Sequence, residues 1–176
     1  SNNKHLGNIL INNQDQDILA FQIDFDSDAL DIFTIRNIYN YFYEDFDRNI
    51  IGDLKLNSKL FTINNFEIYD LNSQLSFSED SINLKKFKGE WFGGSINGEF
   101  KVLNNSSYDY NGRILFKNIN GKDFFSDYFE YANFNTEMSS EILISGKANN
   151  FNEFFKTMLG EGEIQFKKNL LKGFNT

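Results

Sequence analysis

Hydrophobic and polar residues alternate with a period of two over much of the chain, which is typical of β-strands that bury one face. In residues 162–167, Gly162, Ile164 and Phe166 share one parity, and the polar residues between them share the other. Residues 95–102 alternate in the same way. Further strands are predicted over Ile18–Phe25, Asp53–Leu56, Lys59–Ile63, Phe66–Leu71, Ser73–Phe77, Ser81–Phe87, Tyr108–Phe116 and Ser139–Gly146. The pattern therefore predicts about ten strands.

Other segments have the three-to-four spacing of amphipathic helices. We predict three helices, over Ala29–Phe46, Lys122–Tyr131 and Phe151–Leu159. Asp26 or Ser27 caps the first of them, and the third begins after Asn150 and ends at Gly160. Turn-forming residues separate the strands, and short links favour antiparallel pairing. These turns are expected at Asn64–Asn65, Ser78–Asp80, Asn104–Ser106 and Asn118–Gly121. The fold class is α+β, mainly β, in a single domain over residues 1–176.

The most specific local feature is residues 90–100, where a glycine pair follows the chain's one tryptophan, Trp91, and opens an alternating strand. Gly93 and Gly94 are suited to a bulge or bend between strands, and Gly98 leaves room for a large side chain on a neighbouring strand. We expect a sheet corner packed by Trp91. Trp91, Phe100 and Phe166 are predicted to be mostly buried.

Charge and composition exclude several classes of function. Asp and Glu number 25 against 17 Lys and Arg, a net charge of −8, so the protein repels phosphate backbones and nucleic acid is not an expected partner. No run of 18 apolar residues occurs, so no membrane span is predicted within these residues. There is no cysteine, and the one histidine is His5. Thiolate metal sites and Ser-His or Cys-His catalysis are therefore not expected.

Two acidic segments have the alternate spacing of a calcium loop: Asn13, Asp15 and Asp17, and then Asp24, Asp26 and Asp28. Both lack the glycine that the sixth position of such a loop requires. We expect no metal, no cofactor and an unchanged melting temperature with a chelator. Glycosidase-like carboxylate pairs are a remote alternative, because the alternation places most Glu and Asp residues on wet faces and selects no pair. The chain is predicted not to be an enzyme.

The C-terminal half resembles the C-terminal domain of the AsmA family over residues 72–174. The resemblance rests on residues 75–84 leading to Trp91, Gly93, Gly94 and Gly98, and then on residues 114–125 and 142–148. It continues through the helical segment 151–159, the strand beginning at 160–162 and residues 172–174. The family has strands, glycines and a short helix in this order. The chain begins without methionine and ends just after a strand-like stretch, so we expect a fragment of a longer protein.

The resemblance implies a non-enzymatic periplasmic envelope domain that assists outer-membrane biogenesis or carries phospholipid between membranes. It also implies an inner-membrane anchor outside these residues, and phospholipid, other envelope proteins or the rest of the chain as partners. A curved antiparallel sheet, either an open β-groove or a half-sandwich, fits both the resemblance and the alternation. If helices leave its apolar face open, the lipid-groove candidates are Leu75, Phe77, Ile96, Phe100, Ile114, Phe116 and Ile164.

The competing hypothesis is a structural or adhesive β-module, such as a carbohydrate-binding or surface domain. Eight tyrosines and many asparagines are compatible with it. Tyr39, Tyr41 and Tyr43, however, fall on a predicted helix and make a poor flat platform for a sugar. The arrangement of the helices on the sheet decides between an open groove and a closed core.

Overall fold

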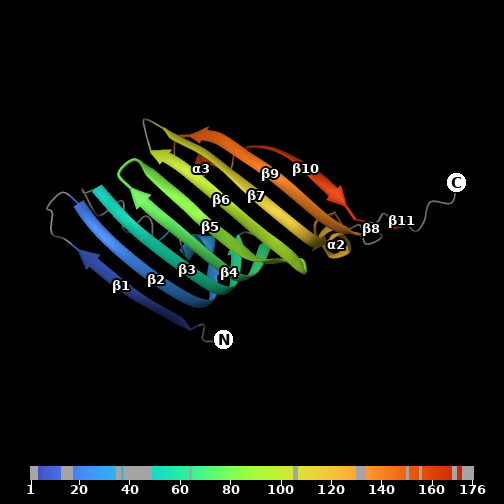
Figure 1. The fold of residues 1–176 in the computed structure, drawn as a ribbon, viewed down its shortest axis with the longest axis horizontal. Coiled ribbons are helices and arrows are strands. Elements are labelled where there is room, and N and C mark those ends of the chain that lie inside the picture. The colour runs from blue at the N-terminus through green and yellow to red at the C-terminus, as the bar shows by residue number, and fades with distance from the viewer. Residues whose placement is uncertain are drawn as a thin grey trace.

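A computed structural model describes residues 4–12, 18–34, 37, 49–63, 65–104, 107–129, 134–149, 151–154, 156–167 and 170–171. Its main feature is a curved nine-stranded sheet, in the order β1-β2-β3-β4-β5-β6-β7-β9-β10 (Figure 1). The strands are β1 (His5–Asn12), β2 (Ile18–Asp31), β3 (Asn49–Ile63), β4 (Phe66–Ser78), β5 (Ser81–Trp91), β6 (Gly94–Asn104), β7 (Tyr108–Asn120), β9 (Glu137–Ala148) and β10 (Leu159–Phe166). The sheet is open, with β1 and β10 at its edges.

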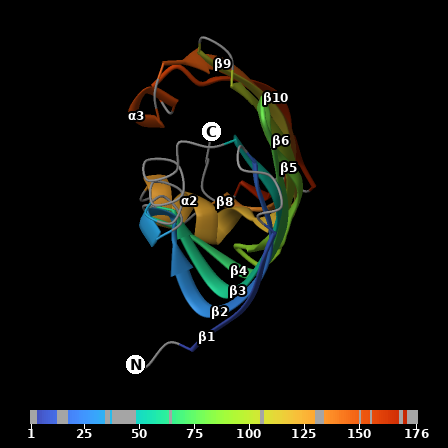
Figure 2. The same cartoon turned by 90° about the vertical axis from the view of Figure 1, so that its left-hand side faces the viewer.

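The remaining described elements are small. Helix α2 covers Gly121–Phe129 and helix α3 covers Phe151–Phe154. Strand β8 (Phe134–Asn135) pairs with β11 (Leu170–Leu171) in a separate two-stranded sheet. Both helices lie on the hollow side of the main sheet, near opposite ends of its strands (Figure 2). The predicted mainly β fold with a curved sheet is therefore confirmed.

Neighbouring strands of the main sheet pair antiparallel, as predicted, with one exception. Strands β2 and β3 are parallel, and their register runs from Ile18 opposite Asn49 to Asp31 opposite Thr62. The helix predicted over Ala29–Phe46 is compatible with this pairing, because parallel neighbours need a crossover of about a dozen residues or more, which is usually a helix. Alternation by itself does not show which strands are neighbours.

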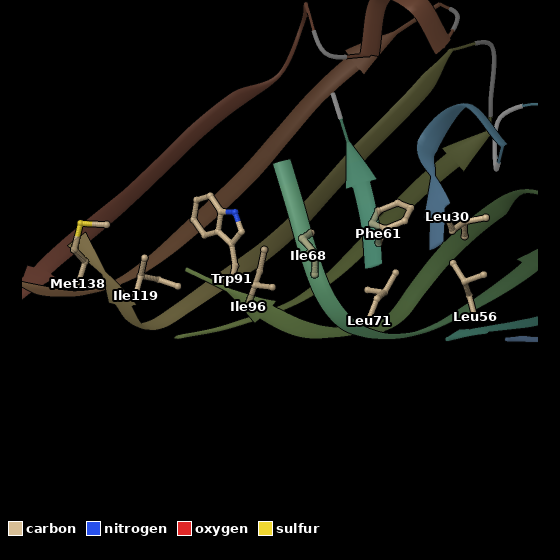
Figure 3. Close-up of a cluster of buried hydrophobic side chains, with 9 residues drawn as sticks. All are labelled: Leu30, Leu56, Phe61, Ile68, Leu71, Trp91, Ile96, Ile119 and Met138. Carbon is tan, nitrogen blue, oxygen red and sulfur yellow. The ribbon is translucent and has the colours of Figure 1, made fainter. Parts of the chain in front are cut away.

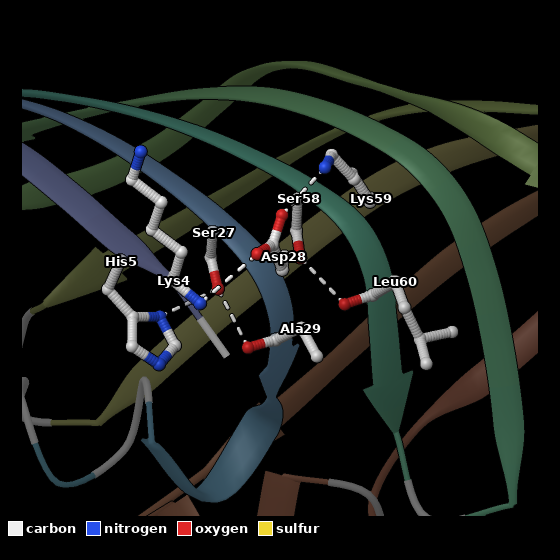
Figure 4. Close-up of polar contacts among 8 residues, drawn as sticks. All are labelled: Lys4, His5, Ser27, Asp28, Ala29, Ser58, Lys59 and Leu60. Atoms are coloured by element: carbon white, nitrogen blue, oxygen red, sulfur yellow. Dashed lines mark hydrogen bonds and ion pairs between the residues drawn. The ribbon is translucent and has the colours of Figure 1, made fainter. Parts of the chain in front are cut away.

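At one place along β2 and β3, the residues that face inward shift by one position, from one alternating set to the other. Figure 4 shows the polar contacts around this irregularity. In β2 the buried residues step from Ser27 to Leu30, and in β3 they step from Ser58 to Phe61. Each serine hydroxyl donates to the carbonyl two residues on, at 2.7 Å in β2 and 2.6 Å in β3. We call these irregularities the matched bulges. Because both strands are displaced equally, their pairing continues beyond them.

The matched bulges explain where the predicted strands were too short. The prediction ended one strand at Leu56 and began another at Lys59, whereas β3 is continuous. Likewise β4 is one strand in place of two, with Asp70 at a positive φ of 48° and a register shift beside it. A bulge interrupts the alternation of side chains without ending the hydrogen-bonded ladder, so period-two counting mistakes it for a break.

Two helix predictions and one turn prediction need correction. Strand β2 continues to Asp31, so Asp26 and Ser27 lie in a strand and do not cap a helix. Residues 32–34 are helical and Asp31 caps them, accepting hydrogen bonds from the Thr34 amide at 2.8 Å and hydroxyl at 3.0 Å. The rest of the predicted first helix falls largely outside the described residues.

The other two corrections concern the ends of later elements. Residues 118–121 are not a turn, because β7 continues to Asn120 and α2 begins at Gly121. The third helix ends at Phe154, because Leu159 and Gly160 pair with Ser145 and Ile144 as the first residues of β10.

Nine buried side chains form the main core cluster on the hollow side of the sheet: Leu30, Leu56, Phe61, Ile68, Leu71, Trp91, Ile96, Ile119 and Met138 (Figure 3). Trp91 is 8% exposed, as predicted. Phe100 is half-buried. The prediction for Phe166 was wrong: it is 41% exposed, because β10 is an edge strand.

Candidate functional site on the concave face

The inner face of the sheet is built from cross-strand rows of apolar side chains. Strand register places Ile23, Leu54, Leu75 and Leu84 directly opposite one another across β2, β3, β4 and β5. The adjacent row is formed in the same way by Phe21, Gly52, Phe77 and Ile82. Since residues two apart in a strand share a face, both rows lie on one side of the sheet.

These two rows form what we call the open strip: Phe21, Ile23, Leu54, Leu75, Phe77, Ile82 and Leu84. All seven side chains are only partly buried. None of them belongs to either buried cluster or to the apolar residues packed against those clusters. Three strand spacings of about 4.8 Å give the strip a width of about 14 Å. It is therefore an apolar surface that the described core does not close.

Gly52 shapes the open strip by its lack of a side chain. A Cβ there would lie 2.8 Å from Cγ of Phe21. The Phe21 and Phe77 rings approach across this glycine, with centroids 5.4 Å apart. The two rings thus form one continuous aromatic surface over three strands.

Helix α2 covers one end of the inner face. Asn120 caps it, because its side-chain oxygen accepts from the amides of Lys122 and Asp123 at 3.1 and 3.4 Å. Phe124 and Tyr128 of the helix then pack on Trp91, with ring centroids 5.5 and 6.4 Å away. This end of the inner face is closed core.

Helix α3 covers part of the opposite end of the inner face. Phe154 stacks on Tyr110 with ring centroids 4.2 Å apart, and the Tyr110 hydroxyl donates to the Phe154 carbonyl at 2.8 Å. Phe100 packs beside both rings. A Cβ at Gly112 would lie 2.3 Å from the Phe100 ring, so this glycine makes room for it. The α3 side is a second, smaller core cluster.

The outer face of the sheet is polar by contrast. Asp24, Asp26 and Asp28 lie on this face of β2, since they alternate with the inner residues. Asp24 and Asp28 pair with the lysines opposite them on β3, with Nζ–Oδ1 distances of 3.5 and 2.7 Å. Asp26 accepts a hydrogen bond from Asn57 at 2.8 Å. The calcium-like spacing of these residues is thus the period of a strand, and each carboxylate has a partner on β3.

The ion pair beside the matched bulges shifts two pKa values. The hydrogen bond from Lys59 lowers the pKa of Asp28, helped by the backbone amide of Lys4, and the same hydrogen bond raises the pKa of Lys59. Both groups are exposed, so the effect is screened by solvent.

An acidic cavity of about 780 Å³ lies beside α2, where β4 and β5 meet the helix. Glu67, Glu90, Asp123 and Asp127 contribute to its lining. Tyr69 donates a hydrogen bond to Glu67 at 2.6 Å, which raises the pKa of Tyr69. These carboxylates disfavour an anionic ligand at this end of the sheet.

The seven predicted groove residues occupy different environments. Leu75 and Phe77 belong to the open strip. Ile96 is 7% exposed in the main core, and Phe116 packs against that core. Phe100 and Ile114 pack against the smaller cluster, and Ile164 is 60% exposed on the edge strand β10. The structure brings two of the seven together in an open surface.

Five members of the open strip were not among the predicted groove residues: Phe21, Ile23, Leu54, Ile82 and Leu84. Three of the predicted strands contain these residues, and the alternation already indicated which face of each strand is apolar. The missing signal was the pairing of β2 with β3 and of β3 with β4, because register cannot be read from alternation alone. Phe21 and Ile23 also lie before the region of resemblance.

The glycine motif forms a tight turn between β5 and β6. Phe92 and Gly93 both have positive φ values, 44° and 70°. This is the pattern of a type I′ hairpin turn. A Cβ at Gly94 would lie 2.4 Å from the Lys117 carbonyl, so the neighbouring strand requires a glycine there. Gly98 lies opposite Phe87, but a Cβ at Gly98 would lie 3.8 Å from the Phe87 ring, an ordinary contact, and 3.1 Å from the Arg113 carbonyl.

Several other candidates remain outside the site. Asn13, Asp15 and Asp17 and the tyrosines at 39, 41 and 43 fall outside the described residues. Within the described ranges, no group of three or more His, Cys, Asp or Glu side chains is arranged to hold a metal ion. No helix in the same ranges has the length and apolar character needed to cross a membrane.

Comparison with known proteins gives one result. The model of the AsmA family matches residues 36–176. This range includes the whole region of the resemblance and extends it toward the N-terminus. No curated protein and no solved structure matches the chain significantly.

Proposed function

Because the chain belongs to the AsmA family, we propose that it is a non-enzymatic domain of a periplasmic envelope protein and that it holds phospholipid acyl chains against the open strip. Family membership suggests an envelope-associated protein. The proposal adds the ligand, the compartment and a contribution to outer-membrane biogenesis or lipid transport between membranes. It also includes an inner-membrane anchor elsewhere in the protein, and other envelope proteins as partners.

The observation that carries the proposal is the open strip. Its seven apolar side chains lie together on the concave face of the sheet and stay partly exposed. Exposed apolar patches of this kind mark interaction sites. Each acyl methylene removed from water contributes about 0.8 kcal/mol. A stretch of about eight methylenes therefore contributes enough for detectable binding.

Acidic side chains lie at both ends of the strands that carry the open strip. The acidic cavity beside α2 repels a phosphate group, and α2 closes that end of the inner face. The open strip lies toward the other ends of the same strands, since Phe77 and Ile82 flank the β4–β5 turn. That turn consists of the exposed residues Glu79 and Asp80, so carboxylates lie at both ends of these strands and the proposal assigns no position to the phosphate.

The test is a charge placed in the open strip. We expect the purified domain, incubated with phosphatidylglycerol vesicles and re-isolated, to carry phospholipid detectable by native mass spectrometry. Phe77→Glu and Leu84→Glu should each reduce the bound fraction at least tenfold, because a carboxylate would have to be desolvated under the acyl chain. These positions lie outside the buried clusters, so the variants are expected to fold.

The matched control is Leu143→Glu, the same chemical change at a side chain that is 54% exposed on the outer face. It should bind lipid like the wild type. Circular dichroism and urea unfolding establish that each variant is folded. A wild type that takes up no lipid, or Glu variants that bind as well as Leu143→Glu, would contradict the proposal.

A further inference from the structure

Edge strand β1 is unusually apolar for a strand with one free side. All eight of its residues are exposed, and its large side chains Leu6, Ile9, Leu10 and Ile11 are 57%, 62%, 67% and 54% exposed. Its pairing with β2 is uninterrupted from His5 opposite Ser27 to Asn12 opposite Ala20. On its other side no strand among the described residues pairs with it (Figure 1).

Strand β1 has none of the features that usually protect an edge. It contains no proline, lysine, aspartate or glutamate, and no bulge interrupts it. Such an edge is a template for pairing with another strand. The opposite edge strand, β10, differs because Glu161 and Glu163 are exposed on it. The two edges therefore differ in charge while sharing exposed apolar residues.

We propose that β1 pairs with β1 of a second copy of this chain, antiparallel, about a two-fold axis at Asn8. Antiparallel pairing of a strand with itself is isologous, so one interface closes the dimer. The axis is perpendicular to the sheet, which keeps both concave faces on the same side. The interface lies beside the open strip, because Ile9 and Ile11 are opposite Ile23 and Phe21 in the β1–β2 pairing, so the test uses lipid-free protein.

The register about Asn8 matches side chains well. Leu6 of each copy faces Leu10 of the other on the outer face, and Gly7 faces Ile9 on the inner face. Four exposed apolar side chains per copy are thus in the pairing region, and no like charges meet. A two-fold axis at Gly162 of β10 would instead place Glu161 of each copy opposite Glu163 of the other, and this repulsion costs stability. Charge therefore selects β1 and not β10 for self-pairing.

His5 holds the end of this edge in place. The Ser27 hydroxyl donates its proton to the Ala29 carbonyl at 2.7 Å, so His5 Nδ1 donates to the Ser27 oxygen at 2.8 Å (Figure 4). The His5 ring also stacks on Phe25, with centroids 6.0 Å apart. Strand β1 is thereby fixed at the end where its pairing with the second copy begins.

The first test is the mass of the lipid-free domain by sedimentation velocity between about 1 and 200 μM, a range that covers ordinary dimer affinities. We expect the wild type to be dimeric at the upper end. Leu10→Lys should be monomeric throughout, because a lysine on an edge strand opposes pairing. The control Ile164→Lys makes a similar change on β10 and should remain dimeric. A monomeric wild type, a dimeric Leu10→Lys or a monomeric Ile164→Lys overturns the proposal.

The second test reads the register. Because the chain has no cysteine, Asn8→Cys introduces a single thiol. Residues opposite one another in an antiparallel pair have Cα atoms about 4.5–5.5 Å apart, within the range a disulfide spans. Mild oxidation should therefore give a covalent dimer of Asn8→Cys, and none of the β10 control Glu163→Cys. Equal cross-linking of the two variants would show that the pairing is not at β1.

Discussion

At the scale of single residues, Trp91 connects the sheet to helix α2. Its ring lies 4.9–6.4 Å from the rings of five neighbours: Phe66, Phe92, Phe116, Phe124 and Tyr128. These residues come from β4, the β5–β6 turn, β7 and α2. Aromatic pairs at such distances add to the free energy of burial. Trp91 is thus the side chain through which several elements share one core.

Replacing Trp91 by Ala should lower the free energy of unfolding by about 3–5 kcal/mol, the usual cost of a cavity left by a large aromatic. The contrasting variant is Phe166→Ala, which should cost about 1 kcal/mol or less because this ring is largely exposed. Urea unfolding followed by circular dichroism measures both. Equal losses for the two variants would mean that β10 is buried in solution.

At the scale of elements, the matched bulges let β2 and β3 bend together. Ser27 and Ser58 are 6% and 3% exposed, and each is held by a hydrogen bond to its own strand. Because the two bulges are opposite one another, the inner face changes parity in both strands at one level. Hydrophobic residues before and after the bulges therefore still point into the same concave side.

Ser58→Ala should lower the free energy of unfolding by about 1 kcal/mol, the typical contribution of one hydrogen bond. Ser76→Ala is the matched control in neighbouring β4, where the side chain is half-buried, and it should change stability by less than about 0.5 kcal/mol. Thermal unfolding of the two variants in one buffer gives the comparison. An unchanged Ser58→Ala protein would show that the hydroxyl is not needed to hold the bulge.

The sequence predicted most strands of the main sheet because one face of each is apolar. Strand β1 was missed because its residues 9–11 are apolar on both faces, which leaves no alternation to read. The start of the first helix was misplaced because Asp26 and Ser27 have the chemistry of a cap but lie in a paired strand. Local chemistry identifies candidates, and pairing with distant strands decides among them.

The candidate site was predictable only in part for the same reason. Leu75 and Phe77 were identified from parity, and parity also pointed to Ile96 and Ile164. Parity gives the face of a strand but not its position within the sheet. Ile96 is on an interior strand and is covered by the core, whereas Ile164 is on an edge strand. The same alternation of apolar and polar residues therefore marks one buried and one exposed side chain.

At the scale of the whole molecule, the sheet separates an apolar inner face from a charged outer face. Ion pairs between adjacent strands include Arg113 with Glu141 at 2.7 Å and Lys147 with Asp109 at 3.3 Å. The hydrogen bond from Arg113 to Glu141 raises the pKa of Arg113. Exposed pairs of this kind contribute little stability individually. Their main effect is to keep the outer face hydrated and the net charge spread over many strands.

Stability should fall in acid. Hydrogen bonds lower the pKa of Asp28 and Asp31 below the ordinary value of 3.8, so both carboxylates stabilise the folded chain above about pH 4. That contribution is lost as the pH falls through the lowered values. We expect the free energy of unfolding to decrease from pH 5 to pH 2, measured by urea titration. The double variant Asp28→Asn, Asp31→Asn should show a shallower decrease, and an identical slope would exclude these two groups as the cause.

The parallel pairing of β2 with β3 has a consequence for how the chain folds. In the β3–β4 hairpin the first contact, Ile63 with Phe66, closes a very short loop. Each later contact of the hairpin then adds little further cost in chain entropy. Every contact between β2 and β3 instead joins residues at one constant separation, as Ile18 with Asn49 shows. Closing that longer loop costs roughly 2 kcal/mol more chain entropy, with no short-range contact to begin from. We therefore expect β2 to join the sheet late, after the β3–β6 hairpins. Its amides should exchange with solvent through openings that leave those hairpins intact.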